Sequence, residues 1–166
     1  GQYLPDWRPG RNYRKSSSAQ KRFGGGVLRD LSHELDLINW LFGPWHRLTA
    51  MGGKHSALEI DSDDTFSLLL SLERCPVVSV TMNYLDDRAT RYMIVNTDSG
   101  TLRTDLIAGT FEANGDRETY DPARDSTYLE EHKAVLEGRT EQLCDIPAGI
   151  ATMEMILAAE RAAHDS

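Results

Sequence analysis

Three residues in one short segment could carry out acid–base chemistry: Asp30, His33 and Asp36. Residues three apart on a helix are neighbours, so either carboxylate could form a hydrogen bond with the imidazole of His33. One interpretation is a helix histidine simply held by a neighbouring carboxylate. The other is a general acid/base, because imidazole changes its charge near neutral pH and a carboxylate can orient it. The spacing alone leaves both interpretations open.

A helix is predicted to carry these residues within the segment 24–43. At about 100° per residue, its apolar side chains fall in one sector, which is typical of a stripe facing the core. That stripe is Val27, Leu28, Leu31, Leu35, Ile38 and Phe42. On the opposite side lie Asp30, His33, Leu37 and Trp40, with Asp36 at its margin. The polar side chains thus have apolar neighbours, so we expect this second surface to be buried or to face a cleft.

The glycines at 24–26 precede this helix, and we interpret them as a flexible start of the helix. They lack the Gly-x-Gly-x-x-Gly spacing of a dinucleotide-binding turn. No metal site is expected either, because Leu37 stands where a zinc-protease motif needs its second histidine. Cys75 and Cys144 are far apart and form no paired zinc-ligand motif.

Length and composition predict a single domain, 1–166, with 40% apolar and 27% charged residues. The net charge of -8 argues against nucleic-acid binding, which needs a basic surface. The sequence has neither a long apolar run nor an apolar signal region, so we expect no membrane span. Two isolated cysteines favour a reducing compartment, and we expect a cytoplasmic location.

Only the N-terminal segment is locally basic. It contains Arg8, Arg11, Arg14, Lys15, Lys21 and Arg22. These side chains form either a solvated surface or a site for an anionic group, such as a sugar carboxylate or a nucleotide diphosphate.

Beyond residue 43 the apolar pattern alternates, which predicts strands. A hairpin is expected over 64–84, with Phe66, Leu68 and Leu70 on its buried face. Further strands and two closing helices complete the prediction: strands at 48–54, 91–96, 100–105 and 110–113, and helices at 128–137 and 147–163. This order predicts an α+β fold, a largely antiparallel open sheet with helices packed on one face.

The segment 24–43 resembles the hallmark of the C-terminal domain of the Gfo/Idh/MocA family of NAD(P)-dependent oxidoreductases. The matching residues are Asp30, His33, Asp36, Trp40, Leu41 and Gly43. The opening, 2–9 and 12–14, is similar to the start of that domain in members associated with bacterial surface-sugar metabolism. One spacing differs, because two residues separate Asp30 from His33 where the family usually has three.

The resemblance implies an enzyme that transfers hydride at a carbinol carbon of a sugar, sugar-nucleotide or cyclitol. His33 would be the base, Asp30 or Asp36 would orient it, and Tyr13, Arg14 and Arg11 are candidate substrate contacts. NAD or NADP would bind to an N-terminal Rossmann domain that this chain lacks. We therefore expect the isolated chain to be inactive, and a stand-alone, non-catalytic sugar-binding or assembly module is the alternative.

The resemblance also implies a homo-oligomer, because in that family the other face of the sheet often packs against a second subunit. Mixed apolar alternation in the strand at 91–96 is consistent with this. Met93 and Val95 are expected on one face of this strand, and Tyr92 and Ile94 on the other.

Overall fold

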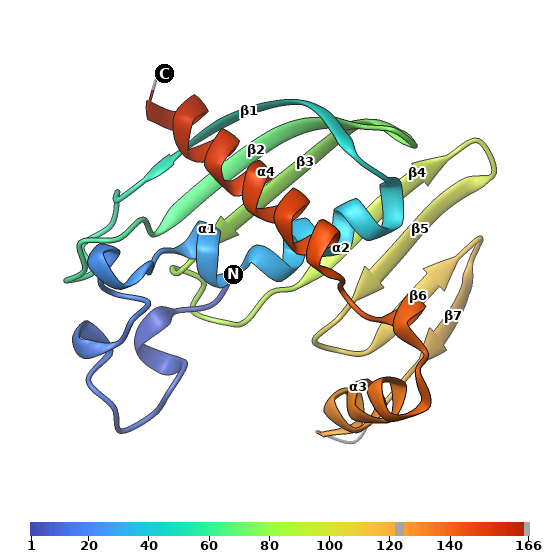
Figure 1. Ribbon diagram of the computed structural model, residues 1–166, viewed down its shortest axis with the longest axis horizontal. Helices are drawn as coiled ribbons and strands as arrows, with labels where there is room; N and C mark the ends of the chain where they lie inside the picture. Colours follow the sequence, from blue (N-terminus) through green and yellow to red (C-terminus); the bar gives the residue numbers. More distant parts are fainter. Residues whose placement is uncertain (122–124, 165–166) are drawn as a thin grey trace. The chain divides into compact units, whose positions relative to one another are not determined.

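The computed structural model describes residues 1–121 and 125–164 (Figure 1). Its helices and antiparallel strands confirm the predicted α+β class. The chain groups into two compact units. Unit 1 comprises Gly1–Arg88 and Asp145–Ser166, and unit 2 comprises Ala89–Cys144. None of the helices in the described residues combines the length and the hydropathy that a membrane span requires.

Unit 1 is a three-stranded sheet, sheet A, with helices on one face (Figure 1). Its strands pair in the order β1-β2-β3 and all pairs are antiparallel. The strands are β1 (Trp45–Gly53), β2 (Thr65–Leu72) and β3 (Cys75–Asn83), and the helices are α1 (Val27–Asp30), α2 (Ser32–Phe42) and α4 (Ile146–His164). Three short 3-10 helices precede α1, at Leu4–Asp6, Tyr13–Lys15 and Lys21–Phe23.

The core lies between sheet A and these helices. Alternate residues of β2 point into it, and Phe66, Leu68 and Leu70 are each at most 4% exposed. Leu35 of α2 and Met155 of α4 are completely buried. The hairpin predicted over 64–84 is confirmed, since β2 and β3 pair along most of their length.

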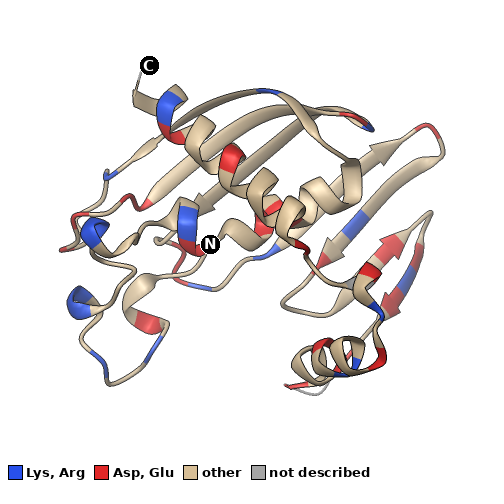
Figure 2. Ribbon diagram, in the orientation of Figure 1, with Lys and Arg blue, Asp and Glu red and all other residues tan. Residues whose placement is uncertain are grey.

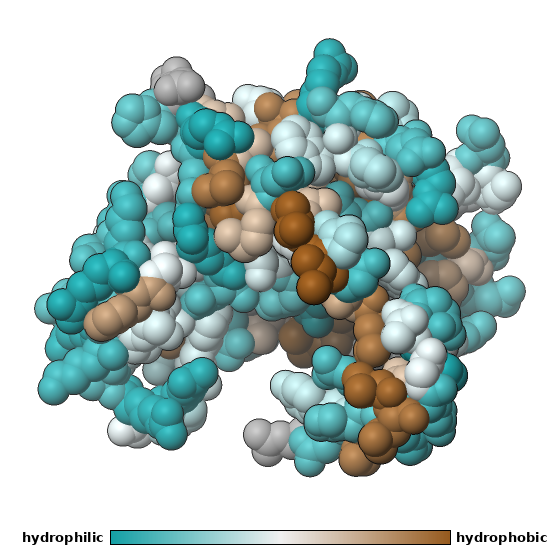
Figure 3. Space-filling view, in the orientation of Figure 1, coloured by the Kyte–Doolittle hydropathy of each residue, from teal (hydrophilic) through white to brown (hydrophobic). Residues whose placement is uncertain are grey.

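Helix α4 is apolar on two sides. One side is buried in the core through Met155, Ile156 and Ala159. The other side stays exposed and shows as a brown stripe in Figure 3, with Ile146, Ile150, Met153 and Leu157 each more than 40% exposed.

The single helix predicted within 24–43 is divided in two at Leu31, whose φ of -99° and ψ of 24° are not helical. The amide of Glu34 then donates to the Leu31 carbonyl, 2.9 Å away, which starts α2. The hydrophobic pattern gave no sign of this break, because Leu31 still packs against the core.

Unit 2 contains a second antiparallel sheet, sheet B, in the order β4-β5-β6-β7. Its elements are β4 (Tyr92–Thr97), β5 (Gly100–Asp105), β6 (Thr110–Ala113), β7 (Asp116–Thr119) and helix α3 (Ser126–Glu137). The prediction of one sheet was therefore wrong in this respect, because the strands within residues 1–121 and 125–164 form two hydrogen-bonded sheets. Strand β7 was missed because its four residues are polar or charged and show no apolar alternation.

Candidate functional site

The imidazole of His33 is half-exposed at the start of α2. Its side chain is 53% exposed, and its Nε2 lies 3.2 Å from Oε1 of Glu34. The opposite face of α2 is fixed in the core by Leu35 and Ile38. The helix therefore presents an accessible proton acceptor on a firmly held backbone, with a carboxylate beside it.

Asp30 lies at the end of α1, and its carboxylate accepts a hydrogen bond from a buried tyrosine. The hydroxyl of Tyr84 donates to Asp30 Oδ2 at 2.6 Å. Tyr84 is completely buried, and its ring meets Trp7 edge to face at 5.2 Å. Burial, and then the hydrogen bond to Asp30, raise the pKa of Tyr84, so its hydroxyl stays a donor to that carboxylate.

Asp36 faces α4. The hydroxyl of Thr152 donates to Asp36 Oδ1 at 3.2 Å, which links the two helices. Across residues 1–121 and 125–164, the structure pairs His33 with Glu34 and not with Asp30 or Asp36. An orienting role for Asp30 or Asp36 stays a prediction. Sequence reasoning missed Glu34, because adjacent helix residues are not expected to face each other.

The start of α1 is packed tightly. The amide of Leu28 donates to Asp63 Oδ2 at 3.0 Å, and the amide of Val27 donates to the Asp63 carbonyl. A side chain at Gly26 would overlap the Asp63 carboxylate, and one at Gly25 would overlap the carbonyl oxygens of residues 17 and 18. We expected a flexible start here, but the glycines instead permit close packing.

These glycines do not fit a dinucleotide. Carbonyl oxygens and the Asp63 carboxylate surround Gly25 and Gly26, and such groups repel the phosphates of a cofactor. In the described residues, no group of three or more histidine, cysteine, aspartate or glutamate side chains could hold a metal ion.

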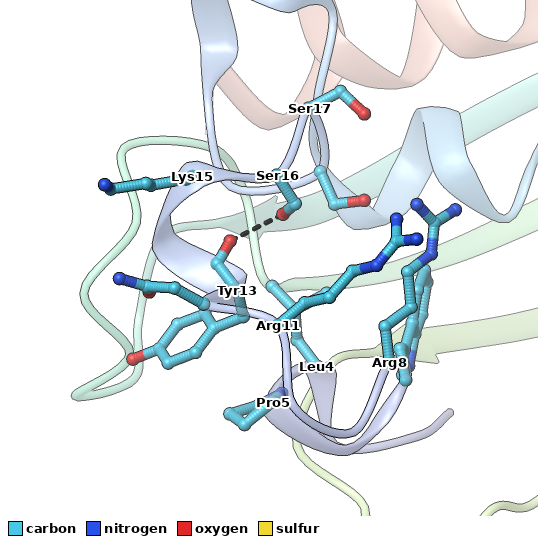
Figure 4. Close-up of a pocket in the computed structure, with 11 residues that line it drawn as sticks. Leu4, Pro5, Arg8, Arg11, Tyr13, Lys15, Ser16 and Ser17 are labelled. Atoms are coloured by element: carbon cyan, nitrogen blue, oxygen red, sulfur yellow. Dashed lines mark hydrogen bonds between the residues drawn. The ribbon is translucent and has the colours of Figure 1, made fainter.

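A cavity of about 440 Å³ lies in the N-terminal segment (Figure 4). Arg8, Arg11 and Lys15 line it together with Trp7 and Tyr13. In Figure 4 the guanidinium groups of Arg8 and Arg11 extend in the same direction, whereas Lys15 points the opposite way. Figure 2 shows that basic residues are distributed along this N-terminal segment.

The structure separates the three predicted substrate contacts. Tyr13 and Arg11 line the cavity, but Arg14 does not. Its guanidinium forms an ion pair with Glu59 and lies 5.6 Å from the centre of the Tyr13 ring. Arg8, which does line the cavity, was recognised only as part of the basic segment.

Comparisons with known proteins agree with this architecture. A family model, the GFO/IDH/MocA C-terminal domain, matches residues 1–103. No curated protein matches the sequence significantly.

Several solved structures share the fold. GenD2 from gentamicin A biosynthesis, in complex with NAD, has a TM-score of 0.71 at 24% identity, over 90% of this chain and 49% of that chain. The WlbA dehydrogenase from Bordetella pertussis, in complex with NADH and UDP-GlcNAcA, has a TM-score of 0.67 at 20% identity, over 85% of this chain and 46% of that chain. An oxidoreductase from Thermotoga maritima has a TM-score of 0.75 at 17% identity, over 98% of this chain and 50% of that chain.

This chain spans about half the length of those relatives. The family model covers well over half of the chain and includes α1, α2 and sheet A. The chain therefore belongs to the GFO/IDH/MocA C-terminal domain family.

Proposed function

We propose that this chain is the substrate-binding and catalytic-histidine domain of an NAD(P)-dependent oxidoreductase. The substrate class is a sugar, sugar-nucleotide or cyclitol, and the reaction is hydride transfer at a carbinol carbon. The observation that carries the proposal is the half-exposed imidazole of His33 on a helix whose other face is buried. Membership of the family supports it.

The chemistry assigned to this chain is proton transfer. A carbinol can lose hydride from carbon only if its hydroxyl also loses a proton, so a base must lie beside that hydroxyl. His33 fills this role in the proposal. Glu34 lies at ion-pair distance and would stabilise the imidazolium that forms.

The cofactor, NAD or NADP, is assigned to a Rossmann domain outside this sequence. Two observations support this assignment. The glycines at 24–26 are surrounded by acceptor oxygens, and GenD2 and WlbA, which bind NAD and NADH, are about twice as long as this chain. Antibody detection of the native polypeptide tests it, since a band near twice 18.6 kDa is expected. A band at 18.6 kDa would favour a stand-alone module or a two-subunit enzyme.

Replacement of His33 in the complete polypeptide tests the mechanism. With sugars, sugar-nucleotides and cyclitols as substrates, His33→Ala is expected to lower turnover by about 10²–10⁴-fold, with little change in NADH affinity. His46→Ala is the matched control, because His46 is exposed on β1. Equal turnover by the wild type and His33→Ala would remove His33 from the mechanism.

We also propose association of two copies through an exposed sheet face. Sheet A exposes Met51, Leu69 and Val77 on the face away from the helices, each by more than half. Exposed apolar side chains gathered on one face are typical of an interface. Sedimentation velocity at tens of micromolar tests this, and a strictly monomeric chain would contradict it.

A further inference from the structure

The N-terminal cavity is positively charged although the chain carries a net charge of -8. Three cations line it, Arg8, Arg11 and Lys15, and its described lining includes no aspartate or glutamate. Within residues 1–121 and 125–164, none of the three forms an ion pair. By contrast, Arg14 in the same segment is neutralised by Glu59. The cavity therefore has uncompensated positive charge, which favours an anionic ligand.

A tight turn brings two of these cations together. The amide of Arg11 donates to the carbonyl of Arg8 at 3.1 Å, and Pro9 and Gly10 occupy the centre of the turn. Gly10 has a φ of +80°, as the third residue of a type II turn requires. Because Arg8 and Arg11 are the ends of this turn, their guanidinium groups extend in the same direction in Figure 4.

Aromatic surface completes the cavity. Trp7 is held in place, since its indole N–H donates to the Gln2 carbonyl at 3.3 Å and its ring packs against Tyr84. Tyr13 is held as well, because its hydroxyl accepts from the Glu59 amide at 3.3 Å. Fixed aromatic rings beside paired guanidinium groups suit a ligand with a planar ring next to phosphate groups.

We propose that this cavity binds the diphosphate group of a nucleotide-linked ligand, with Arg8 and Arg11 as the phosphate contacts. Each planar guanidinium can donate two hydrogen bonds to a phosphate, and two of them on one turn match two adjacent phosphates. The volume of about 440 Å³ lies within the range of small-molecule sites and exceeds what a single phosphate needs. The inference rests on the proposed function, because it narrows the substrate class of the same domain.

Calorimetric titration of the protein with UDP, inorganic pyrophosphate and glucuronate tests the proposal. UDP is expected to bind most tightly, pyrophosphate more weakly and glucuronate least. Arg8→Gln/Arg11→Gln is expected to weaken UDP binding by about tenfold to a hundredfold. Arg161→Gln, which removes an exposed charge on α4, is the matched control and is expected to change nothing.

A second variant separates geometry from charge. Gly10→Val keeps both arginines but disfavours the φ of +80°, and the space around Gly10 is otherwise open. It is expected to weaken UDP binding because Arg8 and Arg11 are then no longer held at the two ends of one tight turn. Unchanged binding by Gly10→Val or by the double arginine variant would overturn the proposal.

Ligand preference gives two more decisive outcomes. Pyrophosphate binding as tightly as UDP would overturn the nucleotide part of the proposal, and tighter binding of glucuronate would make the cavity a carboxylate site. These titrations contain no cofactor and involve no turnover. A failure to bind therefore leaves the His33 assay untouched, and a failure of that assay leaves the binding result standing.

Discussion

The helix-facing side of sheet A and the apolar side of sheet B have similar side chains but different burial. In sheet A, Ala50, Phe66 and Met82 are each at most 4% exposed. In sheet B, the strand register puts Val95 and Leu102 opposite each other on one face, and both are only half-buried. Because burial of apolar area provides most of the stabilisation, unit 1 is expected to hold the site rigidly. Unit 2 has much less core of its own.

The largest expected difference in unfolding free energy is between the alanine variants of two leucines, one in each unit. Leu35→Ala removes a completely buried side chain from α2 and is expected to lower the free energy of unfolding by about 2–5 kcal/mol. Leu102→Ala in sheet B is expected to cost less than half as much, since its side chain is already partly in water. Urea denaturation of both variants measures the difference. Equal losses would show that the two sheets contribute alike.

Tyr84→Phe is expected to come next. It removes the hydrogen bond to the Asp30 carboxylate from inside the core, and bonds to charged groups contribute about 1.5–3 kcal/mol. Tyr92→Phe in β4 is the matched control, because that ring is 71% exposed and its change is expected to stay within about 0.5 kcal/mol. A Tyr84→Phe variant as stable as this control would mean that water replaces the lost donor.

The neighbouring carboxylates Asp63 and Asp64 in unit 1 are expected to affect the pH dependence of stability in opposite directions. Burial alone would raise the pKa of Asp64, but hydrogen bonds from Ser56, the His55 amide and Lys54 outweigh it and lower that pKa. The contribution of Asp64 to stability is therefore present above its ordinary pKa of 3.8 and is lost as the pH falls through the lower folded-state value.

For Asp63 the sign is reversed. Burial raises the pKa of Asp63. Its contribution to the stability of the fold is therefore fully present below pH 3.8 and is lost as the pH rises through the higher folded-state value. At neutral pH, Asp64→Asn is expected to destabilise the protein more than Asp63→Asn. Thermal unfolding of both variants between pH 3 and pH 7 checks this, and a larger loss for Asp63→Asn would reverse the assignment.

Removal of one partner of an ion pair is expected to change the free energy of unfolding least. Arg29 and Glu160 join α1 to α4 through two hydrogen bonds, of 2.8 and 3.0 Å, and Glu160→Gln is expected to cost about 1 kcal/mol or less. Arg117 and Glu112 pair across sheet B at 3.4 Å and are more exposed, so Glu112→Gln is expected to cost under about 0.5 kcal/mol. High salt should abolish this difference, and its persistence would point to packing instead of charge.

Local patterns predicted the elements better than their assembly. The alternation of Phe66, Leu68 and Leu70 identified β2 because one face of that strand is buried. The polar residues of β7 gave no such signal. The division of the strands into two sheets depends on pairing between distant segments, which a periodic pattern does not encode.

The same limit applies to the site. Periodicity identified the surface that presents His33, because the other face of α2 is apolar. The contact between Tyr84 and Asp30 joins residues far apart in the sequence, so spacing could not reveal it. Which arginines face the cavity depends on the turn at Pro9 and Gly10, and on Glu59 drawing Arg14 away.

Gly25 connects the proposed ligand cavity with α1, the short helix before the one that carries His33, since its missing side chain lets the backbone at residues 17 and 18 lie against the start of α1. Even a methyl group there would push the wall of the cavity and the helix apart. The two parts of the site therefore cannot vary independently during evolution. Sequences that change ligand while keeping this fold are expected to alter side chains around the cavity and to retain glycine at this position.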